Sequence, residues 1–247
     1  MKRRNLVFVL LGLGAAGALA GCADDRAGEG RAAAAPAAAS GWTMPPRIDA
    51  VLDAPASLIF RGAGQPGGRI VLRNEQGGAF AAVADDAGRF EIRMARPTGP
   101  VILTPETQIG QEAAPAPQRL LILDGGRGPI AVLTPGAATR RLDRAPALGA
   151  VDAGGSSMLL SGRAAGGADI ALSVDGRPLT VKAGRDGGWS LVVERGDTVV
   201  AGDETFAYPG ANDTGGGWAE RVGQGWRIRW AAPDGARQTT WLPVAAP

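Results

Sequence analysis

Residues Ser57–Met94 read SLIFRGAGQPGGRIVLRNEQGGAFAAVADDAGRFEIRM, and this stretch decides the fold. It returns at Ser157–Val193 as SMLLSGRAAGGADIALSVDGRPLTVKAGRDGGWSLVV, with one residue missing from the second copy. The matching pairs are Ser57 and Ser157, Gly62 and Gly162, Ile70 and Ile170, Leu72 and Leu172, Gly88 and Gly187, Phe90 and Trp189, and Ile92 and Leu191. A period of about one hundred residues is the size of a domain. The repeat therefore predicts two copies of one β-domain.

Apolar and polar residues alternate in each copy between turns rich in Gly, Pro, Asn and Asp. Phe90 and Ile92, for example, alternate with Glu91 and Arg93, and period two with one apolar face is typical of a half-buried strand. We predict strands over 57–61, 69–73, 79–84, 89–93, 101–104, 119–123 and 130–133, with turns at 74–78, 85–88 and 124–128. No long window has a helical period, so the predicted fold class is all-β.

The C-terminal part is rich in tryptophan and predicts a three-strand meander over 217–222, 226–230 and 238–242. In its middle strand Trp226, Ile228 and Trp230 share one face, and Arg227 and Arg229 share the other. Because burying unpaired arginines is costly, we expect the tryptophan face to be the inner one and the arginines to point outward. Trp218 and Trp241 lie on the flanking strands, and we expect both to stay partly exposed.

Composition excludes several classes of site. The chain has no histidine and a single cysteine, Cys22, which excludes disulfides within the chain, His- or Cys-ligated zinc and His-based catalytic triads. No cofactor is predicted. Without Lys2, Arg3 and Arg4, which precede the apolar run described next, 23 basic residues stand against 24 acidic ones. This near-neutral balance does not indicate a nucleic-acid partner.

The N-terminus has a short basic segment, an apolar run at 6–19 and the sequence Leu19-Ala20-Gly21-Cys22. The apolar run has the length of a signal-peptide core and is too short for a stable transmembrane helix. The last four residues resemble the lipobox of bacterial lipoproteins. The resemblance implies acylation of Cys22, palmitate included, and firm anchoring by three acyl chains. In that family Asp after the cysteine favours the inner membrane, and Ala23 here implies the outer membrane, facing the periplasm. The alternative is an ordinary signal peptide with a chance cysteine.

A second resemblance concerns the repeats. The turn Gly62–Gly67, followed by Ile70 and by DDAGRF at 85–90, resembles bacterial Ig-like and carboxypeptidase-regulatory-like modules. The resemblance implies a β-sandwich in each half, with the aromatic residue filling the core. The second copy departs from the pattern, with Gly166 in place of Pro66 and Trp189 in place of Phe90. Such sandwiches carry many unrelated functions, so the resemblance implies none.

Four segments are therefore predicted: a lipoprotein signal peptide at 1–21, a flexible, disordered Ala-rich tether at 22–46, and Ig-like sandwiches at 47–146 and 147–247. The tether is low in large apolar residues and cannot bury a core. We interpret RAPALGAVDAGG at 144–155 as a short linker between the sandwiches.

Three candidate sites each have a structural alternative. The rings of Trp218, Trp226, Trp230 and Trp241 could stack on sugars, or Trp226 and Trp230 could close the second core together with Ile228, which we favour. Asp85 and Asp86 could bind calcium, but they do not follow the spacing of calcium loops, and a turn explains them. Glu91, Glu194 and Glu220 could supply a glycosidase carboxylate pair, but carboxylates are common on strand faces.

No nucleophile or phosphate-loop motif occurs, and we predict no catalytic residue and no metal site. The leading hypothesis is a non-catalytic, lipid-anchored protein of the bacterial cell envelope that acts as a spacer, scaffold or adaptor. The alternative is a lipoprotein that binds carbohydrate or peptidoglycan through the C-terminal aromatic cluster. Its expected partners are the membrane, through the lipid anchor, and proteins or polysaccharide of the envelope.

Overall fold

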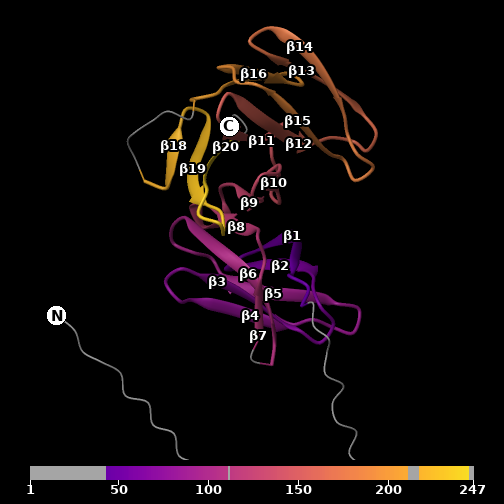
Figure 1. Cartoon of the computed structure of the whole chain (residues 1–247), viewed down its shortest axis with the longest axis vertical. Helices are drawn as coiled ribbons and strands as arrows, with labels where there is room; N and C mark the ends of the chain where they lie inside the picture. The colour runs from indigo at the N-terminus through magenta and orange to yellow at the C-terminus, as the bar shows by residue number, and fades with distance from the viewer. Residues whose placement is uncertain (1–42, 111, 211–216, 245–247) are drawn as a thin grey trace, which may run out of the picture. The chain divides into compact units, whose positions relative to one another are not determined.

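A computed structural model describes residues 43–110, 112–210 and 217–244, and the strands are drawn in Figure 1. Over these residues the chain is all-β, and the only helical element is a 3-10 turn at Asp124–Gly126. All strand pairs are antiparallel, in four sheets that we call A, B, C and D. The predicted all-β class is confirmed.

Sheets A and B belong to the first repeat. Sheet A has the order β1-β2-β5, and sheet B has the order β10-β9-β8-β6-β3-β4, with β7 paired to β6. The bounds are β1 Arg47–Ala54, β2 Ser57–Ala63, β3 Arg69–Asn74, β4 Ala79–Val83, β5 Arg89–Ala95, β6 Val101–Ile109, β7 Glu112–Pro115, β8 Arg119–Ile122, β9 Ile130–Leu133 and β10 Arg140–Arg141.

Sheets C and D belong to the second repeat. Sheet C has the order β15-β12-β11-β20-β19-β18, and sheet D has the order β14-β13-β16-β17. The bounds are β11 Leu148–Gly154, β12 Ser157–Arg163, β13 Asp169–Val174, β14 Arg177–Lys182, β15 Gly188–Glu194, β16 Thr198–Ala201, β17 Glu204–Ala207, β18 Ala219–Val222, β19 Gly225–Ala231 and β20 Arg237–Pro243.

The two repeats share their register. Gly62 on β2 lies opposite Phe90 on β5, and Gly162 on β12 lies opposite Trp189 on β15. A Cβ on Gly62 would lie 2.7 Å from the Phe90 ring, and one on Gly162 would lie 2.7 Å from the Trp189 ring. Both rings are buried, each 5% exposed, because only glycine leaves room for them. The prediction that these aromatics occupy equivalent buried positions is confirmed.

The structural repeat extends beyond the residues whose sequences match. β1 pairs with β2 and β11 pairs with β12, and each pair has a register shift at the same place, between Ile48 and Ala50 and between Leu148 and Ala150. The linker predicted at 144–155 is therefore wrong from Leu148 onward, because β11 is an interior strand of sheet C. Its Gly and Ala residues resemble a linker but pack closely between neighbouring strands.

The residues that the structure describes form three hydrophobic clusters. The first lies between sheets A and B and includes Phe60, Phe90 and Leu120, and the second lies between sheets C and D and includes Leu160, Trp189 and Trp241. The third, which we call the junction cluster, joins the outer faces of sheets B and C. Its buried members are Leu121, Leu123, Ala131, Leu133, Ala150, Ile228, Trp230, Ala232 and Leu242.

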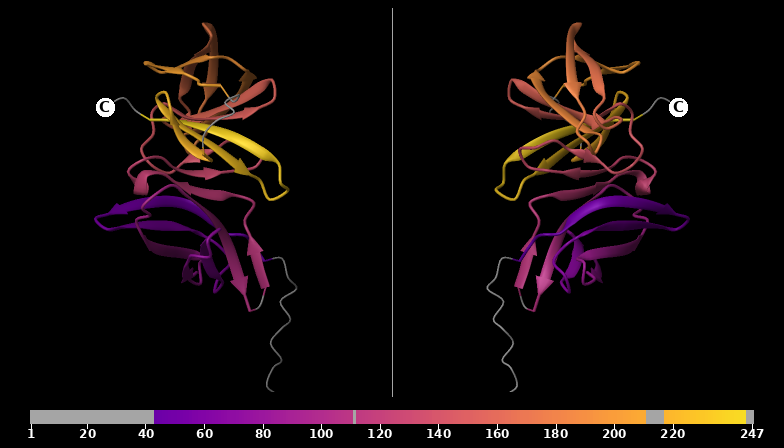
Figure 2. Two further views of the ribbon diagram at one scale, coloured as in Figure 1. Left: turned by 90° about the vertical axis from the view of Figure 1, so that its left-hand side faces the viewer. Right: turned by 90° about the vertical axis from the view of Figure 1, so that its right-hand side faces the viewer.

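The junction cluster explains the burial of β8 and β9. Leu120 and Ile122 face the first cluster, whereas Leu121 and Leu123 face the junction cluster. Figure 2 shows in two further views how β8 and β9 approach the yellow C-terminal meander. Residues 42–247 form one compact unit by their contacts, and the division into two domains at residue 146 stays a prediction.

Side-chain hydrogen bonds hold two further segments of this unit in place, the segment around β10 and the residues that precede β1. Arg141 is buried and donates hydrogen bonds to the carbonyl oxygens of Gly149, at 3.1 Å, and Pro243, at 2.8 Å, while it pairs with Asp143. It thus ties β10 to β11 and to the end of β20. In the second segment, the Met44 carbonyl accepts a hydrogen bond from the Thr107 hydroxyl at 2.9 Å. Residues 44–46, which we assigned to the tether, therefore already lie against the first repeat.

Candidate ligand-binding site

The C-terminal meander that holds the predicted tryptophans is part of sheet C. β20 pairs with β11 on one side and with β19 on the other, and β18 forms the edge. The predicted three-strand meander is confirmed. Because sheet D covers one face of sheet C and sheet B covers the other, both faces of the meander meet a core.

Two of the four predicted tryptophans are buried in different clusters. Trp230 is 5% exposed and lies in the junction cluster, where its indole N–H donates to the Thr240 hydroxyl at 3.1 Å. Trp241 is fully buried in the second cluster, edge-on to Phe206 and Tyr208 at ring distances of 6.3 and 6.1 Å. The inward position of Trp230 is confirmed, but the expectation that its face of β19 closes the second core is wrong, because that face meets the junction cluster. The partial exposure expected for Trp241 is also wrong, since Trp241 fills the second core instead.

The outward face expected for Arg227 is also wrong. Its side chain lies on the same face of the sheet as Trp241 and is 1% exposed. It pairs with Glu220 at 3.0 Å and donates to the Pro209 carbonyl at 3.1 Å. Arg229 also binds Glu220, at 2.8 Å, and is partly exposed. Burial is tolerated because the guanidinium has a carboxylate and a carbonyl as acceptors, which the expectation of an unpaired arginine did not include.

The other two tryptophans are less buried. Trp226 packs partly against the junction cluster, with the Arg221 guanidinium 5.5 Å above its ring. Trp218 is 41% exposed, as expected. The four rings therefore do not form one coplanar exposed row, and Trp218 is the ring most accessible to a ligand.

Trp218 borders a cavity of about 260 Å³ beside the junction cluster. Trp230 and Ile102 contribute apolar walls, and Glu75, Arg119 and Arg229 contribute charged groups. Burial lowers the pKa of Arg119, and the nearby carboxylate of Glu75 opposes that shift. An exposed aromatic face beside hydrogen-bonding groups has the chemistry of a small sugar site.

The other sequence candidates lie apart. Glu91 on β5 pairs with Arg61, Glu194 on β15 pairs with Arg177, and Glu220 is on β18. β5 belongs to sheet A, and β15 and β18 lie at opposite edges of sheet C, so the structure does not bring these three carboxylates together.

The Asp85 carboxylate closes its own turn. It accepts hydrogen bonds from the backbone N–H groups of Arg89, at 2.8 Å, and Ala87, at 3.0 Å. The hydrogen bond from the Arg89 N–H is the main cause of the lowered pKa of Asp85. The turn interpretation thus explains why Asp is present at this position.

Sequence reasoning missed a polar network around Asp152. Its carboxylate accepts from the Thr139 backbone N–H at 2.7 Å, from the Thr139 hydroxyl at 2.6 Å and from the Thr240 hydroxyl at 2.7 Å. Burial raises the pKa of Asp152, and these hydrogen bonds oppose the rise. No pattern in the sequence pointed to this residue, because it lies in the segment of small residues that resembled a linker.

Cys22, the predicted lipidation site, lies outside the described residues. Within the part of the chain that the structure describes, no helix is long and apolar enough to cross a bilayer.

Comparisons with known proteins identify no family for this chain. No family model and no curated protein matches the chain. Among solved structures, one described as a Ca²⁺-stabilized adhesin that helps an Antarctic bacterium reach out and bind ice is 10% identical, over 83% of this chain and 50% of that one, with a TM-score of 0.24. This chain thus spans about half the length of the adhesin structure. A TM-score this low is no evidence of a shared function.

Proposed function

We propose that the protein is a lipid-anchored component of the bacterial cell envelope that acts as a non-catalytic spacer, scaffold or adaptor. The proposed cellular location rests on the lipobox at residues 19–22, and Ala23 favours the outer membrane, facing the periplasm. The structural role rests on one observation: the aromatic meander is built into two cores, since Trp230 lies in the junction cluster and Trp241 lies in the second cluster. Side chains used in this way hold the repeats in a fixed relation and suit a spacer.

The Ig-like family assignment of the repeats is part of this proposal. It is supported by the paired sheets of each repeat and by the equivalent burial of Phe90 and Trp189. A carboxylate such as Glu91 or Glu194 that is paired with arginine on an exposed strand face fits a solvated surface better than an acid–base pair.

The proposed cellular location is tested by labelling cells with an alkyne fatty acid and separating their membranes. The wild-type chain should carry the label and sediment with the outer membrane, and Cys22→Ala should lose both the label and the membrane fraction. Cys22→Ser serves as a second variant of nearly equal size that lacks the thiol. Label and membrane fraction unchanged in both variants would contradict the proposal.

The role is tested by pull-down of the mature protein against its own envelope, with proteins and sugars both analysed. An adaptor should retain envelope proteins, and this retention should survive Trp218→Ala. Retention of polysaccharide alone would contradict the adaptor role.

The cavity beside Trp218 favours carbohydrate or peptidoglycan binding as the second candidate function. On that hypothesis Trp218→Ala should abolish retention on polysaccharide, and Trp218→Phe should keep part of it because it keeps an aromatic face. Val192→Ala is the matched control, since Val192 is a large exposed apolar residue away from this cavity. Equal retention by Trp218→Ala and Val192→Ala would rule the second candidate out.

A further inference from the structure

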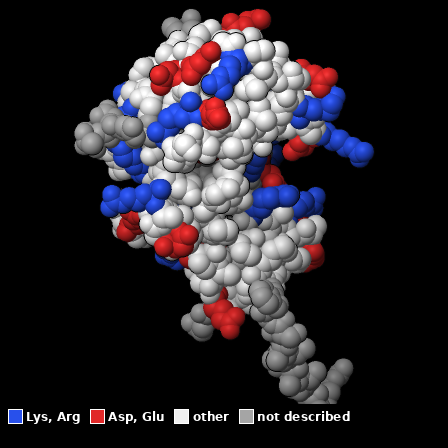
Figure 3. All heavy atoms as spheres, turned by 45° about the horizontal axis from the view of Figure 1, so that its top comes forward, with Lys and Arg blue, Asp and Glu red and all other residues white. Residues whose placement is uncertain are grey.

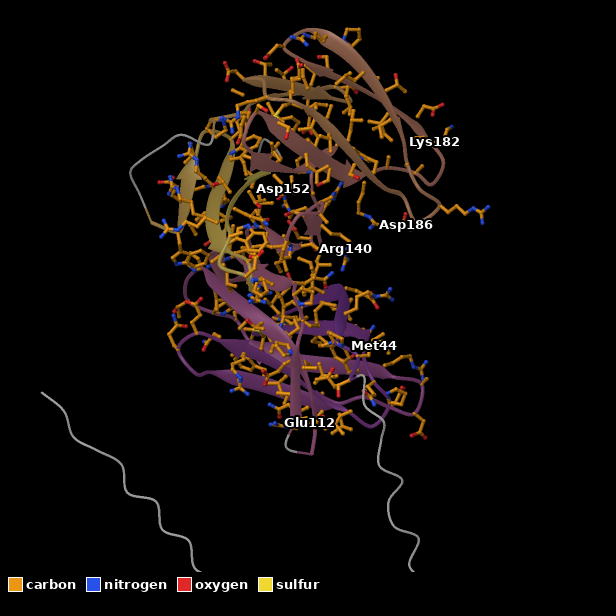
Figure 4. All side chains as sticks on the ribbon, in the orientation of Figure 1. Met44, Glu112, Arg140, Asp152, Lys182 and Asp186 are labelled. Atoms are coloured by element: carbon orange, nitrogen blue, oxygen red, sulfur yellow. The ribbon has the colours of Figure 1, made fainter. Side chains whose placement is uncertain are left out.

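A second cavity, of about 620 Å³, lies between the β10 segment and strands β12 and β15. Its volume is in the range of small-molecule sites. Its basic lining residues are Arg140, Arg141, Arg144, Arg163 and Lys182, and its acidic ones are Asp143 and Asp186. Five positive against two negative side chains give the lining a net charge of +3 at neutral pH. The hollow bordered by basic side chains in Figure 3 is on the side where Figure 4 labels Arg140, Lys182 and Asp186.

Ion pairs neutralise two of the five cations, and the other three make no ion pair with the residues that the structure describes. Arg141 pairs with Asp143 at 2.5 Å, and Lys182 pairs with Asp169 at 2.9 Å. Arg140 donates to the carbonyl oxygens of Ile48 and Asp49, and Arg163 donates to the Asp186 carbonyl. Carbonyl oxygens satisfy hydrogen bonds but carry no net charge.

Two further observations concern the electrostatic surroundings of Arg140 and the lack of an ion-pair or hydrogen-bond partner for Arg144 among the described residues. Burial is the main cause of the lowered pKa of Arg140, and the positive charges of Arg163 and Arg47 lower it further, against Asp49 and Asp186. Arg144 is exposed and makes no ion pair or hydrogen bond with the residues that the structure describes. Its guanidinium is therefore available to a ligand.

The rest of the lining fits the organic part of such a ligand. Pro146 and the small exposed edge of the otherwise buried Trp189 ring provide apolar surface, and Ser190 provides an exposed hydroxyl. A phosphate ester carries close to two negative charges and three strong acceptor oxygens, and guanidinium forks match that geometry. A monocarboxylate supplies one charge and would leave more of the cationic excess uncompensated.

We propose that this cavity binds a small phosphate ester, with Arg144 and Arg163 as direct ligands of the phosphate and Trp189 against the organic group. The binding site is independent of the lipid anchor and of the spacer role. The ester could be a free metabolite or the monoester headgroup of phosphatidic acid, since both present a terminal phosphate with close to two negative charges.

Calorimetry on the purified full chain tests the proposal, with glycerol 1-phosphate as the probe and a sugar acid as the carboxylate comparison. Glycerol 1-phosphate should bind, more weakly at high salt because the contacts are ionic. The double variant Arg144→Gln/Arg163→Gln should bind it roughly tenfold or more weakly, as loss of charge-assisted hydrogen bonds predicts. Arg93→Gln/Arg177→Gln is the matched control, because it removes two exposed arginines that do not line the cavity.

A vesicle experiment separates the two sources. The chain with Cys22→Ser, which removes the acylated thiol, is sedimented with vesicles of phosphatidylcholine that contain phosphatidic acid and with vesicles of phosphatidylcholine alone. Sedimentation with the first only, lost in the Arg144/Arg163 variant, supports the site with a lipid headgroup as ligand. Binding of glycerol 1-phosphate without sedimentation supports it with a free ester.

Three results would overturn the proposal: no binding of phosphate in either form, equal weakening in the control variant, or a sugar acid bound as tightly as the ester. A change in fluorescence on addition of the ester that persists in Trp189→Phe would overturn the position given to the organic group. None of these outcomes depends on whether Cys22 is acylated.

Discussion

The two repeats have the same central strands but extend different sheets. In the first repeat the additional strands β9 and β10 lengthen sheet B, and sheet A stays at three strands. In the second repeat β18, β19 and β20 lengthen sheet C, the counterpart of sheet A, to six. The added strands then meet, and β9 and β19 both contribute to the junction cluster. The comparison shows that the strands with a shared register form each sandwich, and that the residues joining the two lie mostly on the other strands, with Ala150 on β11 as the exception.

The largest effect should come from the residues that the repeats share. Phe90→Ala and Trp189→Ala each remove a buried ring packed over a glycine, and each should lower the free energy of unfolding by about 3–5 kcal/mol. Denaturant unfolding measures both. Val83→Ala and Val192→Ala, at exposed positions of the two repeats, are the controls. A large loss for one ring and none for the other would break the equivalence of the repeats.

The next effect concerns the junction that the repeats do not share. Leu121→Ala on β8 and Leu242→Ala on β20 each empty a fully buried position and should cost about 2–5 kcal/mol. Because both belong to one cluster, the double variant should deviate from the sum by roughly 0.5–3 kcal/mol. Strict additivity in unfolding experiments would mean that sheets B and C do not support one another.

A smaller effect distinguishes two ion pairs. Glu91 pairs with Arg61 on exposed strand faces of the first repeat, and Glu220 pairs with the buried Arg227. Glu91→Ala should cost at most about 1 kcal/mol, as exposed pairs do. Glu220→Ala should cost about 1–3 kcal/mol because it removes an acceptor from a buried cation. Equal losses in thermal or denaturant unfolding would contradict the burial of Arg227.

The smallest effect is a dependence on pH. Asp152 occupies the position that Leu52 has in the first repeat, since each lies opposite the third residue of the next strand, Leu159 of β12 and Ile59 of β2. Burial raises the pKa of Asp152 in the folded chain above its unfolded value. The folded chain therefore binds a proton at Asp152 more tightly than the unfolded chain does. The stability that this proton binding adds is fully present below the pKa of Asp152 in the unfolded chain, and it is lost as the pH rises through the pKa in the folded chain.

The measurement is the difference in unfolding free energy between the wild type and Asp152→Asn, taken from about pH 3 to 8. This difference should fall as pH rises. Leu52→Asn, with no carboxyl group replaced, should show no such trend of its own. A difference that increases with pH would mean that the hydrogen bonds from Thr139 and Thr240 outweigh burial.

Much of the fold could be predicted from the sequence, and the failures have a common physical cause. Alternation around Phe90 and Ile92 located the strands because one face of sheet A meets a core and the other meets water. The same reasoning failed for Arg227 and Trp241, because sheet C is covered on both faces and alternation does not reveal a second cover. β11 was missed because its Gly and Ala residues carry little hydrophobic signal. The cavity beside Arg140 and Arg163 joins residues far apart in the chain, and no local pattern brings them together.

The contact between Arg140 and β1 bears on self-association. β1 is an edge strand, and the unpaired carbonyl and N–H groups of an edge can template strand addition by a second molecule. Its counterpart β11 has β20 on that side, whereas β1 meets side chains: Arg96 donates to the Ala54 carbonyl, and the Arg140 guanidinium is bound to the carbonyls of Ile48 and Asp49. Together with the local bulge, these cations shorten the run of acceptors available to an incoming strand. At this edge of the first repeat, arginine side chains thus hinder the edge-to-edge pairing that a whole strand prevents at the matching edge of the second.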